Sequence, residues 1–168
     1  GMNAIEAGFA AASPGDFECV RAIATEVKGS TITALARTKE GDIKAAADAL
    51  APAERSRIHV FIATSPLHME YKLKMTPEQV MAQVQQAVPL ARSLANEVEF
   101  SAEDASRSEL PFLIDVFKAA VAGGATVLNI PDTVGYAVPE EFEKLVKQII
   151  DGAGAGPEVV YSVHCHND

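Results

Sequence analysis

Short runs of apolar and β-branched residues recur about every 30 residues along the chain, and helical patterns separate them. Each run has the length of a strand and shows little alternation of apolar and polar residues, which is typical of parallel strands covered on both faces. The runs lie at residues 3–9, 31–36, 57–64, 97–101, 126–130 and 159–163. Six strands alternating with five helices predict a single-domain α/β protein.

Capping residues mark where the helices begin. An N-cap side chain accepts a hydrogen bond from a free amide in the first turn, and proline suits the first helical position. The expected helix starts are at Asp16, at Thr76 with Gln79 as a capping box, at Ser106 with Glu109 as another, and at Pro139.

Two α/β architectures fit this alternation: an open doubly wound sheet and a (β/α)8 barrel. A barrel of eight such units takes roughly 250 residues, so 168 residues fall about two units short of closure. An open sheet fits the length, yet no glycine-rich phosphate loop follows any of the strands. The pattern by itself leaves both architectures open.

Composition narrows the class of partner. The chain has 14 Lys and Arg against 23 Asp and Glu, a net charge of −9, and the lack of a basic cluster argues against nucleic acid or anionic lipid. No apolar run approaches the roughly 20 residues of a membrane span, and no signal peptide is evident. Cys19 and Cys165 are too few for a disulfide framework. We therefore expect a cytoplasmic protein that binds small molecules or other subunits, with neither a membrane nor a nucleic acid as partner.

Polar and ionisable residues stand at or just after the predicted strand ends. In both architectures the ligand site forms at the C-terminal edge of the parallel strands, so this placement predicts a site without choosing the fold. The residues concerned are Arg37, Thr64, Ser65, Glu103, Asp104, Asp132, Thr133, His164 and His166.

The His-x-His pair at the last strand is the sharpest of these features. Side chains alternate along a strand, so His164 and His166 share one face about 7 Å apart at the backbone, with Cys165 on the other. Two imidazoles so placed can converge on one divalent ion. A pair of hydrogen-bonded histidines is the competing explanation, because a catalytic metal usually takes a third or fourth protein ligand.

Structural roles compete for the other candidates as well. Asp132 and Thr133 could hold a substrate carboxylate, but a turn is the better explanation of this pair taken alone. Glu103 and Asp104 are adjacent and face different ways, so one is expected to point inward and the other to cap a helix. His59 inside a strand suits a core histidine.

A solvated loop is the expectation for residues 65–75. This segment carries Lys72 and Lys74, and a loop explains such lysines more simply than an anion site does.

Five strings carry a resemblance to a known family. They are IEAGFAAASPGDFE, HVFIATSPLHMEYKLKM, VEFSAEDASRSEL, NIPDTVGYAVPEEF and SVHCHND. Together they resemble the catalytic barrel of the 2-isopropylmalate synthase family, within the wider metal-dependent acyltransferase and lyase barrels. HCHND marks only the wider group, whereas HMEYKLKM with NIPDTVGYAVPEEF is characteristic of the isopropylmalate enzymes.

The resemblance implies a partial TIM barrel, with about six parallel strands and outer helices, over residues 1–168. These residues resemble strands two to seven of the eight. The family's first-strand D-x-T-L-R-D-G-x-Q motif, its eighth strand and its C-terminal regulatory domain are expected to lie outside them. The resemblance also implies a parent enzyme that is a homodimer or higher homo-oligomer.

The implied reaction is a Claisen-type condensation of acetyl-CoA with 2-oxoisovalerate in leucine biosynthesis. The family implies a divalent ion (Mn, Mg or Zn) on His164 and His166. It also implies that Thr133 bonds the keto-acid carboxylate and that Glu103 positions metal-bound water or substrate, both as catalytic residues. His59 and Ser101 would line the keto-acid pocket.

Two alternatives remain. One is a sister enzyme, such as a homocitrate or citramalate synthase or a metal-dependent lyase, since one methylene of substrate is worth only about 1 to 3 kcal/mol. The other is a non-catalytic metal-binding or subunit-interaction fragment. With the first-strand residues absent, the isolated chain is expected to be inactive.

Overall fold

A computed structural model describes residues 1–167, so Asp168 of the SVHCHND string lies outside the described residues. Six parallel strands form one sheet in sequential order, from β1 at one edge to β6 at the other. This confirms the predicted curved, open, partial barrel and excludes the reversed order of a doubly wound sheet. The strands are β1 (Ala4–Gly8), β2 (Thr31–Arg37), β3 (Ser56–Ala63), β4 (Glu97–Glu103), β5 (Val127–Asp132) and β6 (Val160–Cys165).

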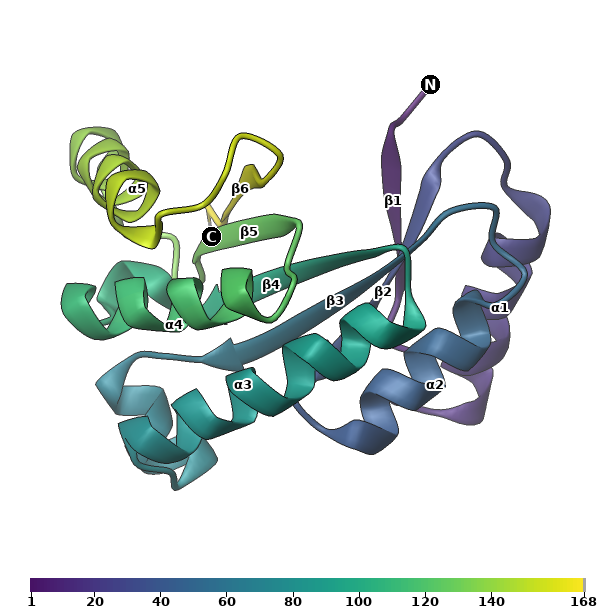
Figure 1. Cartoon of the computed structure of the whole chain (residues 1–168), viewed down its shortest axis with the longest axis horizontal. Coiled ribbons are helices and arrows are strands. Elements are labelled where there is room, and N and C mark those ends of the chain that lie inside the picture. The colour runs from purple at the N-terminus through teal and green to yellow at the C-terminus, as the bar shows by residue number, and fades with distance from the viewer. Residues whose placement is uncertain (168) are drawn as a thin grey trace.

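Five α-helices form an arc around the sheet and leave its other side open (Figure 1). They are α1 (Pro14–Glu26), α2 (Glu40–Leu50), α3 (Pro77–Leu94), α4 (Leu110–Ala122) and α5 (Pro139–Ala153). A short π-helix, η1 (His68–Leu73), follows β3, and a 3-10 turn, η2 (Ala105–Arg107), follows β4. None of the helices within residues 1–167 is long and apolar enough to cross a bilayer.

The two faces of the sheet differ in polarity. Apolar side chains on the outer face pack against the helices, as where the rings of Phe100 and Phe117 meet edge to face at 6.0 Å. On the inner face, by contrast, polar side chains are buried between the outward-facing apolar residues of their strands. Examples are Thr33 of β2, Ser101 of β4 and Asn129 of β5. The expectation of little alternation was therefore wrong for these strands. The outer-face core consists of Ile32, Ala34, Ala36, Ile58, Val60, Ile62, Val98, Phe100, Ala102, Leu128 and Ile130.

The N-terminal end of the inner face is held by an ion-pair network. Arg57 of β3 contacts Glu97 at 2.6 Å and Glu99 at 3.2 Å, both on the neighbouring strand β4. All three side chains are at least two-thirds shielded from solvent. The opposite, C-terminal end of the same face is open to ligands.

The predicted helix starts are partly right. Thr76 and Gln79 form the expected capping box at α3, and Pro139 opens α5. The first helix starts earlier than expected, because Ser13 is its N-cap and accepts from the Asp16 amide at 3.1 Å. Asp16 instead lies in the first turn, where a carboxylate interacts favourably with the helix dipole.

The capping box expected at Ser106 and Glu109 is wrong. Glu109 itself is the N-cap of α4, without a side-chain cap bond among the described residues. Ser106 lies in η2 and donates to Asp132 Oδ1 at 2.7 Å. Its hydroxyl is therefore used to hold the end of β5 against η2.

Residues 65–75 are not a plain loop. Residues 68–73 form a π-helix, with Met69 buried and Lys74 closing it in the left-handed conformation (φ 55°). Single-turn π-helices occur frequently at functional sites. This segment lies beside the C-terminal ends of β3 and β4, where the predicted site residues also lie.

Candidate functional site

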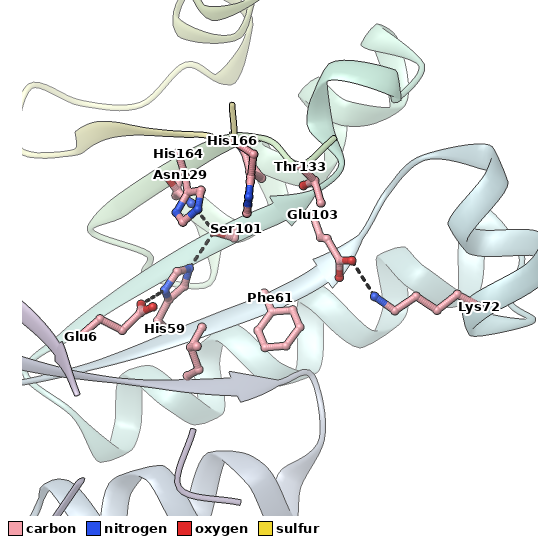
Figure 2. Close-up of a pocket in the computed structure, with 12 residues that line it drawn as sticks. Glu6, His59, Phe61, Lys72, Ser101, Glu103, Asn129, Thr133, His164 and His166 are labelled. Carbon is pink, nitrogen blue, oxygen red and sulfur yellow. Dashed lines mark hydrogen bonds and ion pairs between the residues drawn. The ribbon is translucent and has the colours of Figure 1, made fainter. Parts of the chain in front are cut away.

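A cavity of about 330 Å³ opens at the C-terminal end of the inner face (Figure 2). The six residues that the sequence assigns to the site all line it, from the three strands β3, β4 and β6 and from the segments that follow β5 and β6. They are His59, Ser101, Glu103, Thr133, His164 and His166. Their side chains therefore share one cavity, as expected from strand ends that meet at one edge.

A chain of hydrogen bonds crosses the middle of this cavity from β1 to β5. His59 Nδ1 lies 2.5 Å from Glu6 Oε2, and His59 Nε2 lies 2.7 Å from Ser101 Oγ. Asn129 Nδ2 donates to the same Ser101 oxygen at 2.6 Å. The core-histidine explanation for His59 holds in part, since its ring is buried and satisfied, yet it also faces the cavity.

The partners of His59 set its tautomer. A carboxylate only accepts hydrogen bonds, so Nδ1 of His59 carries a proton toward Glu6. In the neutral ring Nε2 is then an acceptor, and the Ser101 hydroxyl donates a hydrogen bond to it. The hydrogen bond from His59 does most to lower the pKa of Glu6, and burial opposes it. The positive charges that His59 and His164 carry when protonated lower it further.

Glu103 faces the cavity and pairs with a lysine. Its carboxylate lies 2.5 Å from Lys72 Nζ of η1 and is 19 % exposed. Both residues also line a second cavity of about 300 Å³, next to the C-terminal ends of β2 and β3. The pair therefore stands at the junction of the two cavities.

Asp104 turns away from the cavity, as one of the two adjacent acids was expected to do. It is fully buried, in the left-handed conformation (φ 64°), and bonded to Arg107 at 2.8 Å. Burial acts to raise the pKa of Asp104. Hydrogen bonds from Arg107 and Ser65, with the charges of Arg107 and His68, outweigh burial and lower it. Asp104 caps no helix with its side chain, which corrects the second half of that expectation.

Thr133 is oriented by the backbone of the neighbouring loop. Its Oγ1 accepts the amide of Asp104 at 2.9 Å. A hydroxyl has one proton and two acceptor lone pairs, so this contact leaves the proton of Thr133 available to a ligand in the cavity. Asp132 forms the turn that its residue type suggested, because Oδ2 accepts the Ala137 amide at 3.0 Å.

His164 and His166 lie side by side on the inner face at the free edge of the sheet. Their ring centroids are 4.8 Å apart, and both residues are exposed. Two imidazole nitrogens suit Zn²⁺ and similar divalent ions. No group of three His, Cys, Asp or Glu side chains within residues 1–167 could hold an ion. The two imidazoles are thus ligands of the type that such an ion prefers, and they supply two of the positions around it.

Three polar residues that line the cavity were not assigned to the site from the sequence. Glu6 lies inside the first strand, Asn129 inside the fifth, and Lys72 in the segment expected to be a loop. The signal for Glu6 and Asn129 was available: each is a polar residue at an inward position of an otherwise apolar strand. Lys72 carried no such signal, because the π-helix that directs it follows from packing.

The chain spans about a third of the length of curated relatives that it matches. It is 59% identical to 2-isopropylmalate synthase of Aquifex aeolicus over 99% of this chain and 32% of that protein. The corresponding enzyme of Heliobacterium modesticaldum is 55% identical over 100% of this chain and 33% of its own length.

Solved structures support the fold. HMG-CoA lyase from Brucella melitensis superimposes with a TM-score of 0.77 at 18% identity, covering 99% of this chain and 60% of the lyase. At that identity the likeness concerns the fold alone. The family model described as HMGL-like, whose enzymes are typically metal-dependent, matches residues 1–168. Sequence, sheet order and the shared cavity therefore agree, and the chain belongs to the HMGL-like family.

Proposed function

We propose that this chain forms the keto-acid half of a 2-isopropylmalate synthase site. The reaction is the Claisen-type condensation of acetyl-CoA with 2-oxoisovalerate, followed by thioester hydrolysis, and its setting is the cytoplasm. The observation that carries the proposal is the cavity in which Thr133, His59 and the His164–His166 pair face one another. Identity of 52–59% to 2-isopropylmalate synthases along the whole chain supports the choice of substrates.

The cavity residues suit the two ends of 2-oxoisovalerate. The Thr133 hydroxyl would donate a hydrogen bond to the substrate carboxylate, and His59 and Ser101 line the same cavity in a fixed mutual orientation. The apolar side chains Leu35 and Phe61 supply surface for the isopropyl group. Such prearranged donors favour a reaction because they need no reorganisation as charge develops.

His164 and His166 would hold the divalent ion. When bound, such an ion supplies Lewis acidity that draws charge from the keto group. Glu103 faces the same cavity and would accept a hydrogen bond from water or substrate there. The chain itself therefore contributes keto-acid binding, orientation and two imidazole ligands.

Release of free CoA thiol that depends on 2-oxoisovalerate tests this function. The chain alone is expected to show no turnover. A chimera in which it replaces the matching segment of the Aquifex aeolicus enzyme is expected to turn over. Preference for 2-oxoglutarate or pyruvate would favour a homocitrate or citramalate synthase instead. A folded chimera without any turnover would leave the non-catalytic alternative.

A further inference from the structure

The π-helix η1 (His68–Leu73) contacts both acids at the C-terminal end of β4. Its first residue, His68, places Nδ1 3.0 Å from Asp104 Oδ2. Four residues later, Lys72 places Nζ 2.5 Å from Glu103 Oε1. The two adjacent carboxylates face opposite ways, so η1 holds one on the buried side and one on the cavity side.

The His68 contact is the fixed end of this arrangement. Asp104 is fully buried and also bonded to Arg107, and Ser65 Oγ lies 3.2 Å from the same ring nitrogen of His68. Met69, next along η1, is buried against the core. These contacts fix where η1 starts and hence where Lys72 points.

The Lys72 contact lies at the solvent-facing end of η1. Lys72 is 50 % exposed, and ion pairs of such groups add little to stability. Yet Lys72 is the one Lys or Arg that lines the cavity among the described residues, and it meets the acid the sequence assigns to catalysis. Because the Lys72–Glu103 ion pair adds little to stability and lies at the cavity, its main consequence is the orientation of the Glu103 carboxylate.

We propose that Lys72 is a positioning residue for Glu103, and that η1 is the element that aligns the two. The inference rests on the proposed function, because it concerns the acid of that same site. The Lys72 ammonium restricts the Glu103 side chain to rotamers whose carboxylate faces the cavity. The His68–Asp104 contact fixes η1 to the buried end of β4, and so fixes the position from which Lys72 reaches Glu103.

Ammonium spectroscopy on the 168-residue chain tests the contact itself. In ¹H–¹⁵N spectra an ion-paired lysine ammonium exchanges slowly enough to be seen, whereas a solvated one does not. We expect a Lys72 signal that disappears in Glu103→Gln and survives in Glu70→Gln, a matched change on the exposed side of η1. A signal that is absent, or that persists in Glu103→Gln, overturns the proposal.

Kinetics of the chimera tests the consequence. We expect Lys72→Met to lower kcat by about 10- to 100-fold, because small misplacements of a reacting group have effects of this size. KM should change less, the thermal midpoint should move by less than about 3 °C, and Lys72→Arg should regain most of the turnover. Lys74→Met removes the same charge two residues away and should leave kcat unchanged.

The outcomes separate the two proposals. Equal kcat in the Lys72→Met and Lys74→Met chimeras would overturn the positioning role. If the unmodified chimera shows no condensation, the proposed function fails, and the ammonium signal alone decides whether η1 aligns Glu103. The Arg variant keeps the kinetic test informative if Lys72→Met does not fold.

Discussion

The centre of the inner face and its β6 edge are both lined by histidine, yet they are built differently. At the centre, His59 is buried and bonded through both ring nitrogens, to Glu6 on β1 and Ser101 on β4. At the edge, His164 and His166 are exposed, and their rings contact one another 4.8 Å apart. The central histidine is held at both ring nitrogens, whereas the edge pair is exposed and consists of side chains of a type that binds divalent ions.

This difference explains how one sheet can prepare a site in two ways. Side chains between two strand neighbours lose their freedom when the sheet folds, so the side of the cavity that His59 and Ser101 line is arranged before any ligand arrives. Side chains on the edge strand β6 have a neighbouring strand on one side only. The contrast makes a set of predictions that differ in size.

The largest effect is expected from removing an edge imidazole. We expect His164→Ala to lower turnover of the chimera by at least about 10²-fold, since one preorganised electrostatic partner is typically worth that much. Its stability should change by less than about 0.5 kcal/mol, as is usual for exposed sites. Cys165→Ala lies on the opposite face of the same strand and is the control. Turnover that survives His164→Ala would contradict the metal assignment.

A buried charge should show the reverse behaviour. Asp104→Asn leaves Arg107 without its carboxylate partner, and breaking a buried pair costs about 3 kcal/mol of unfolding free energy. Asp115→Asn, an exposed acid on α4, is the control for denaturant unfolding. Equal stability of the two variants would contradict the anchoring role of Asp104.

The same carboxyl predicts a pH dependence. The pKa of Asp104 is lower in the folded state, so its contribution is fully present above the unfolded value of about 3.9. It is lost as the pH falls through the folded value. The unfolding free energy of the wild type should therefore fall below about pH 4 more steeply than that of Asp104→Asn. If the unfolding free energies of the wild type and of Asp104→Asn fell in parallel with pH, the partners of Asp104 would not lower its pKa in the folded state.

The smallest effect is expected at Glu6. A glutamine at this position can still accept a hydrogen bond from Nδ1–H of His59 through its amide oxygen. Glu6→Gln should therefore change KM for the keto acid only a few-fold, which corresponds to about 1 kcal/mol or less. The ¹⁵N shifts of His59 should move toward a mixture of tautomers. Glu26→Gln on α1 is the control. Unchanged His59 shifts would mean that Glu6 does not set the tautomer.

Much of this fold could be predicted from the sequence because its signals are local. The runs that became β1 to β6, the Thr76–Gln79 capping box and Pro139 at the start of α5 each depend on a few neighbouring residues. The site residues near strand ends were predictable for a related reason, since parallel strands bring their C-terminal ends to one edge. Their chemical roles came from the family resemblance and stay predictions.

The rest depended on contacts between distant segments. Ser106 looked like a cap, but its hydroxyl bonds Asp132 from another strand end. Lys72 looked solvated, but the π-helix directs it to Glu103, 31 residues later. The expectation of little alternation also hid Asn129, a polar residue at an inward position between apolar neighbours of β5.

The four histidines of the chain allow one measurement to test the contrast between centre and edge. Side-chain ¹H–¹⁵N correlation spectra would be recorded while Zn²⁺ is added to the 168-residue chain. We predict that the signals of His164 and His166 move together and saturate at one ion per chain, while His59 and His68 keep their protonated Nδ1 and their shifts. Zinc-dependent changes at His59, or at only one of the two edge histidines, would contradict the account.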